Sequence, residues 1–91
     1  MTSQIRRASV SVAANIAEGH GREQTRPFIQ FLRIAQGSLK ELETHIILSE
    51  QVGVTKRPAT TEIMNLTDEV GRMLRALIRS LQEKLGEPEL A

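Results

Sequence analysis

The sequence predicts an all-α protein, an antiparallel up-down helical bundle, and two observations carry this prediction. Apolar residues recur at alternating intervals of three and four over three long stretches, and no segment alternates with a period of two. Glycine or proline separates the stretches, as expected where helices end. At 91 residues the chain is expected to form one domain, with helices at about residues 3–18, 26–52 and 60–85. Helix ends are expected at Gly19, Gly53 and Gly86, and Pro58 and Pro88 are expected to prevent extension.

The first helix is expected because apolar positions step by four, three and four along it. Gly19 follows, where a left-handed residue commonly ends a helix. The Gly-His-Gly run is therefore predicted to be a helix end and a turn, because phosphate-binding loops place their glycines between a strand and a helix. Anion binding at the next helix N-terminus, beside Arg22 and Arg26, is a weaker alternative. The repeat runs through Ile5, Ser9, Val12 and Ile16.

The second and third helices each carry a heptad seam, the repeat by which long helices pack side by side. Thr25 is expected to cap the second helix, and Thr60 or Thr61 to open the third. Apolar side chains beyond these seams exceed what three helices can bury, which predicts that copies of the chain cover one another. The seams run through Phe28, Leu32, Ala35, Leu39, Leu42 and Ile46, and through Ile63, Leu66, Val70, Met73, Leu77 and Leu81.

Charge is distributed unevenly, although the formal net charge is only +1. Residues 1–40 hold six basic and two acidic residues, whereas residues 41–91 hold six basic and nine acidic ones. The first two helices place bases early and acids late, against the preference of the helix dipole. Ion pairs between helices or subunits are one explanation, with Arg6 or Arg7 facing Glu43 or Glu50, and Glu18 facing Arg22 or Arg26.

A ring of arginines is the second explanation. In an assembly of copies, the basic halves of the chains would together attract RNA or DNA. Arg72, Arg75 and Arg79 form a separate stripe on the third helix, which solvation and an intrahelical pair with Asp68 explain more simply than the alternative, contact with phosphate. The ring would consist of Arg6, Arg7, Arg22, Arg26 and Arg33.

Five polar or small residues are expected to have structural roles. Gly37 lies inside the second helix, where glycine costs about 1 kcal/mol relative to alanine, and suits a close approach of backbones. Asn15 and Ser38 are candidates for polar contacts that fix one packing arrangement. Glu18 and Glu41 complete this set.

Catalytic, metal and cofactor sites are not expected. Glu41 and His45 are one turn apart, but di-iron bundles repeat Glu-x-x-His twice and add two carboxylates, a pattern missing here. Cysteine is absent and the only aromatic residues are Phe28 and Phe31, which excludes thiolate metal sites and disfavours base-stacking platforms. No apolar run approaches the ~20 residues of a membrane span, so a cytoplasmic protein without a membrane or small-molecule partner is predicted.

Three segments, QIRRA, NIAEG and GSLKELET, carry a resemblance to a known family by their order and spacing. The chain resembles the four-helix-bundle proteins encoded by intervening sequences of bacterial 23S rRNA genes. Related proteins are similar to the accessory subunits of diversity-generating retroelements, basic pentamers that bind nucleic acid and a reverse transcriptase. The resemblance implies a ring-forming homopentamer without enzymatic activity, which acts as a scaffold or adaptor. The alternative is an accessory protein that binds RNA, DNA or a nucleic-acid enzyme.

One feature departs from that family. Its members carry a further amphipathic helix ahead of the segment that starts at Thr2, and here Met1 stands directly before that segment. The resemblance therefore implies a chain that depends more strongly on oligomerisation than its relatives. The sequence is also less basic than the retroelement accessory proteins, so the scaffold is the first interpretation and nucleic-acid binding the second.

Overall fold

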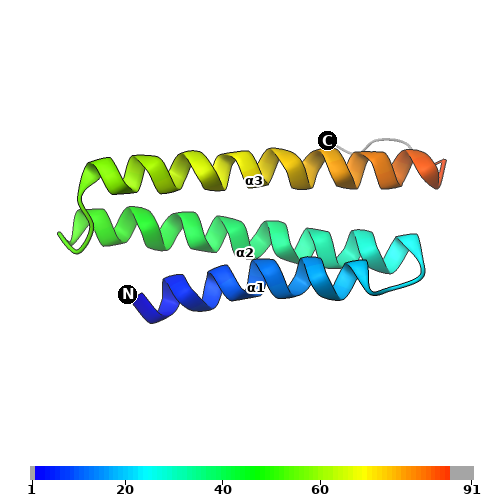
Figure 1. Ribbon diagram of the computed structural model, residues 1–91, viewed down its shortest axis with the longest axis horizontal. Helices are drawn as coiled ribbons and strands as arrows, with labels where there is room; N and C mark the ends of the chain where they lie inside the picture. Colours follow the sequence, from blue (N-terminus) through cyan, green and yellow to red (C-terminus); the bar gives the residue numbers. More distant parts are fainter. Residues whose placement is uncertain (1, 87–91) are drawn as a thin grey trace.

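Three α-helices make up the computed structural model: α1 (Thr2–His20), α2 (Thr25–Gln51) and α3 (Arg57–Lys84). The structure describes the backbone of residues 2–86 and the side chains of residues 3–86. No strand occurs in this described part, so the predicted all-α class is confirmed. Consecutive helices run in opposite directions, and α2 lies between α1 and α3 (Figure 1).

The predicted glycine helix ends are confirmed for α2 and α3 but not for α1. Gly53 and Gly86 follow their helices in the left-handed region, with φ of 83° and 73°. Gly19 instead lies inside α1 and is buried. A Cβ atom at Gly19 would lie 2.9 Å from Phe28 Cδ1 and 2.9 Å from Phe31 Cβ. The prediction that Gly19 ends the helix is wrong, because this glycine permits a close approach of α1 to α2.

The starts of α2 and α3 also differ from the prediction. Thr25 is the first helical residue of α2, and the extended residue before it, Gln24, makes no capping hydrogen bond with its side chain. α3 begins at Arg57, ahead of the expected Thr60. Pro58 lies in the first turn of α3, where the missing N–H of proline needs no partner. The helix α2 does end ahead of Pro58, in agreement with the prediction that this proline prevents its extension, and Pro58 itself lies in the start of α3. Pro88 lies outside the described residues.

The core is built on α2, whose predicted seam is confirmed. Leu32 and Ala35 in the middle of the seam have no exposed surface, and Phe28 at its start is partly buried against the core. Full burial of a leucine contributes roughly 1.5–3 kcal/mol. Because most of the buried aliphatic side chains belong to α2, this helix contributes most of the packing energy. The other core residues are Ala8 and Val12 of α1, Ile29, Leu39, Leu42 and Ile46 of α2, and Leu74 and Ile78 of α3.

The face that α3 turns toward α2 is not the predicted one. The expected seam, from Ile63 to Leu81, lies on an adjacent side of the helix, and Leu66 and Met73 on it are 56% and 67% exposed. The residues that α3 buries are Thr60, Thr67, Gly71, Leu74, Ile78 and Gln82.

Two features explain why α3 buries this face: a small residue that allows close approach, and hydroxyls that form hydrogen bonds within α3. A Cβ atom at Gly71 would lie 3.4 Å from Leu39 Cδ2, so glycine allows α3 to sit close to α2. The hydroxyls of Thr60 and Thr67 donate to carbonyl oxygens one turn earlier, at 3.2 and 2.9 Å. Both hydroxyls therefore keep a hydrogen-bond partner when they are buried, so their burial costs little free energy.

The helices α1 and α3 pack on α2 but not on each other. Among the described residues, no Cα atom of α1 lies within 8 Å of a Cα atom of α3. Figure 1 shows α1 and α3 on either side of α2 and parallel to one another. This arrangement leaves one side of the molecule, between α1 and α3, covered by neither helix.

Candidate interaction surfaces

An apolar groove opens between α1 and α3, with α2 as its floor. It encloses about 160 Å³. Most of its lining side chains are aliphatic, and its two polar members, Ser9 and Thr67, both donate their hydroxyls to carbonyl oxygens of their own helices. The surface therefore offers shape and apolar contact to a partner, but few hydrogen bonds. The aliphatic lining consists of Val12 of α1, Leu39 and Leu42 of α2, and Leu66 and Val70 of α3.

The α3 seam extends this groove along the helix. We use this name for Ile63, Leu66, Val70, Met73 and Leu77, which follow one another at intervals of three and four. Apart from the half-buried Val70, these side chains are exposed. The seam is about 21 Å long, at 1.5 Å per residue. An apolar stripe of this length on a water-facing helix is typical of a surface that another helix covers.

The five arginines expected to form a ring do not come together within one chain. Arg6 and Arg7 lie near the start of α1, whereas Arg22 follows its end, roughly 20 Å away at 1.5 Å per helical residue. Only Arg26 and Arg33, seven residues apart on α2, share a helix face. Any common ring of all five would need several copies of the chain.

Glu43 and Glu50 pair with residues closer than those predicted, whereas Glu18 pairs with Arg22 as predicted. Glu43 lies 3.6 Å from Lys40, and Glu50 lies 3.1 Å from Arg57 across the turn between α2 and α3. Among the described residues, Arg6 and Arg7 make no ion pair. The intrachain pairing of these arginines with Glu43 or Glu50 is therefore wrong, because partners one helical turn or one loop away are available.

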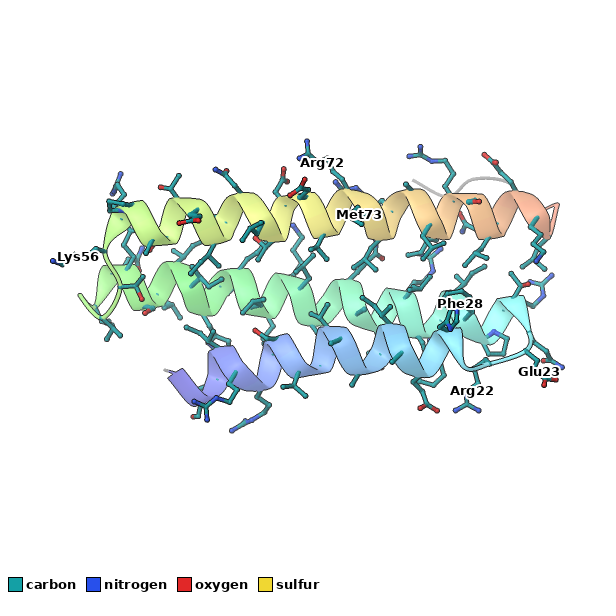
Figure 2. All side chains as sticks on the ribbon, in the orientation of Figure 1. Arg22, Glu23, Phe28, Lys56, Arg72 and Met73 are labelled. Carbon is teal, nitrogen blue, oxygen red and sulfur yellow. The ribbon has the colours of Figure 1, made fainter. Side chains whose placement is uncertain are left out.

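Arg22 is held at the first turn by two contacts. Its Nη2 donates to Glu18 Oε1 at 2.7 Å, and its guanidinium lies 5.1 Å from the centre of the Phe31 ring. Figure 2 shows Arg22 and Phe28 at the same end of the molecule, beside the turn between α1 and α2. Both partners of the ion pair are about half exposed, so it contributes at most about 1 kcal/mol.

A small polar cluster joins α1 to α2. The hydroxyls of Ser11 and Ser38 are 2.7 Å apart, and Asn15 Nδ2 donates to the backbone oxygen of Ser11 at 2.8 Å. Asn15 and Ser38 thus meet through Ser11, which was not among the predicted residues. The signal was present in the sequence, since Ser11 lies one helical turn before Asn15 and shares its face.

The remaining predicted structural residues are exposed. Gly37 has no atom within 4 Å of the position that a Cβ would take, so it permits no close contact within the chain. Glu41 Oε1 lies 3.6 Å from His45 Nε2 on the surface of α2.

A family model described as 23S rRNA-intervening sequence protein matches residues 1–76. The chain belongs to this family. The match spans α1, α2 and most of α3, so it includes all the elements that line the apolar groove. No curated protein matches the chain.

The described residues of this 23S rRNA-intervening sequence protein contain no group of three or more histidine, aspartate or glutamate side chains placed to hold a metal ion. Over the same residues, none of the three helices combines the length and the apolar character that crossing a membrane requires.

Proposed function

We propose that this 23S rRNA-intervening sequence protein is a non-catalytic scaffold or adaptor that works as a ring of identical chains. The observation that carries the proposal is the exposed α3 seam beside the apolar groove. Ile63, Leu66, Met73 and Leu77 are 39%, 56%, 67% and 37% exposed, which together equals about two complete side chains. Covering them with another copy would contribute roughly 3–6 kcal/mol per chain.

The proposed contact combines the seam with the groove. Association costs on the order of 4–15 kcal/mol in lost translational and rotational freedom, and the seam alone offsets only the low end of this range. The groove lining adds apolar area from all three helices of the same chain. If Met73 and Leu77, the part of the seam outside the groove lining, pack into the groove of the next chain, the contact is head-to-tail, and such contacts form a ring when the rotation between chains closes. We propose five copies, the number expected if the resemblance of related proteins to retroelement accessory subunits extends to this chain.

A charge placed on the seam tests the proposal. The double variant Leu66→Glu/Met73→Glu would bury two carboxylates in the interface, so we expect its mass by light scattering to fall to that of smaller species. The matched control is Asn65→Glu/Ala76→Glu, which adds the same charges to exposed positions of the same helix outside the seam. We expect the control to keep the mass of the unchanged protein.

Two results would count against the proposal. One is a seam variant that keeps the full assembly, and the other is a control that loses it to the same extent. Far-ultraviolet circular dichroism of both variants establishes that any change in mass is not a loss of helix.

A further inference from the structure

Two acidic residues stand along one edge of the α3 seam. Glu62 precedes Ile63 and Glu69 precedes Val70, so the two acids lie seven residues apart on the same side of the helix. Both are exposed, and among the described residues neither forms an ion pair. We call Glu62 and Glu69 the acidic pair. Its carboxylates are available to a partner that approaches the seam.

The start of α1 carries the opposite charge. Arg6 and Arg7, which we call the arginine pair, are exposed and form no ion pair within the described part of the chain. The ten residues that follow, 8–17, include no charged side chain, and Val10 among them is 60% exposed. Helices that face water normally carry charged residues on that side. This stretch of α1 is therefore suited to contact with another apolar surface.

Ser9 identifies the side of α1 that borders the apolar groove, because it lines the groove. Arg6, three residues earlier, and Ala13, four residues later, share this side of the helix, and both are exposed. This side of α1 therefore begins with a cation and continues without charge. The α3 seam has the acidic pair beside its first half and only apolar side chains after it. Both surfaces thus change from charged to apolar in the same chain direction.

The fold places these two surfaces on different sides of the molecule. Figure 1 shows α1 and α3 on either side of α2 and parallel to one another. When copies of the chain stand side by side in the same orientation, α3 of one copy meets α1 of the next, and both helices start at the same end. Each chain then uses a different surface toward each of its neighbours, and such contacts form a ring when the rotation between chains closes.

We infer that α3 of one copy packs along α1 of the next copy in the parallel direction, with the acidic pair beside the arginine pair. This inference rests on the proposed ring, and it adds which helix the seam meets and in which direction. Opposite charges at the edges of packed helices select the partner and its orientation. Because Ser9 and Val12 of α1 also line the apolar groove, this packing brings the seam of one copy to the groove of the next.

The charges also set the register of the two helices. Parallel helices rise equally, so seven residues cover about 10.5 Å on both of them. With Arg6 level with Leu66, between the two acids, Ala13 is level with Met73. Met73 is 67% exposed, and the small side chain of Ala13 leaves room for it.

Charge reversal, followed by sedimentation equilibrium, tests the pairing. For Glu62→Arg/Glu69→Arg we expect the concentration at which half of the chains are assembled to rise about tenfold at low salt, because like charges replace the ion pairs. Arg6→Glu/Arg7→Glu should give a similar rise, although acids at the start of a helix favour its formation. The variant with all four substitutions restores opposite charges, so this concentration should return to within about threefold of that of the unchanged protein.

The matched control is Glu41→Arg/Glu83→Arg, which changes the net charge equally at exposed positions away from the seam. We expect the control to leave assembly unchanged. At about 0.5 M salt, where exposed charges are strongly screened, the losses of both reversal variants should shrink. Far-ultraviolet circular dichroism of each variant checks that its helices are kept.

Disulfide linkage tests the direction of packing. The chain has no cysteine, and no Cα atom of α1 lies within 8 Å of one of α3 among the described residues, which is too far for a disulfide within one chain. A chain with Ala13→Cys and Met73→Cys should therefore link different copies under mild oxidation, and the largest product on a denaturing gel counts the copies. Antiparallel packing at the same level would instead bring Ala13 to Ala59, so Ala13→Cys with Ala59→Cys should not link.

Three outcomes would overturn the inference: a four-substitution variant that assembles as weakly as the two reversal variants, a control that loses assembly to the same extent, and linkage through Ala59 in place of Met73. Its failure differs from a failure of the proposed function. Full assembly that withstands both charge reversals but not Leu66→Glu/Met73→Glu refutes this pairing alone. An unchanged protein that remains at 10.1 kDa refutes the ring together with it.

Discussion

Two glycine-to-alanine substitutions should change stability in opposite directions. Gly19 and Gly37 both lie inside helices, and composition gives no reason to treat them differently. Their surroundings differ, because a Cβ at Gly19 would lie 2.9 Å from both Phe28 Cδ1 and Phe31 Cβ, whereas Gly37 has nothing within 4 Å. We expect Gly19→Ala to destabilise the protein and Gly37→Ala to stabilise it.

The magnitudes follow from the contacts. The Phe28 ring can rotate away from a new methyl group, but Phe31 Cβ is fixed by its backbone, so α1 would have to move away from α2. Such overpacking costs about 1–3 kcal/mol. The gain in helix propensity at Gly19 is small because the residue lies next to the end of α1, which leaves a net loss of roughly 1–2 kcal/mol. Gly37→Ala, in mid-helix, should gain about 0.5–1 kcal/mol.

Thermal unfolding followed by circular dichroism measures both effects. For a domain of this size, 1 kcal/mol shifts the melting temperature by about 4–8 °C. All samples need the same protein concentration, because association contributes to the apparent stability. If Gly19→Ala raised the melting temperature as Gly37→Ala does, the close contact between α1 and α2 at this position would be refuted.

Two further predictions concern the core and the surface. Leu32→Ala, at a position with no exposed surface, should lower the free energy of unfolding in urea by about 2–5 kcal/mol. Ile34→Ala, at a residue 44% exposed, should lower it by less than half as much. Equal losses in the two variants would contradict the assignment of the core. Glu50→Gln, which removes the 3.1 Å ion pair with Arg57, should cost at most about 1 kcal/mol, and a larger loss of stability would show that the turn between α2 and α3 depends on this pair.

The seam of α2 could be predicted from the sequence because this helix carries no second repeat that is equally apolar. α3 carries two repeats with the same spacing, and the more apolar one, through Leu66 and Met73, is exposed. The buried one relies on Gly71 for close approach and on Thr67 for a hydroxyl that bonds within its own helix. The periodicity of the sequence cannot distinguish the two repeats, since which of them is buried depends on how α2 packs against each side of α3.

Long-range contacts also explain the other differences. Gly19 has the sequence signature of a helix end, and only its closeness to Phe28 and Phe31 reveals its packing role. The arginines of the first forty residues formed a group by composition, but the length of α1 separates Arg6 from Arg22.

Sedimentation equilibrium over about a hundredfold dilution, combined with thermal unfolding of the same samples, measures whether the chains depend on one another for stability. We expect a mass that is a multiple of 10.1 kDa and a melting temperature that falls with dilution, because chains must bury one another's α3 seams. A particle of 10.1 kDa that unfolds cooperatively at the same temperature at every concentration would contradict this expectation.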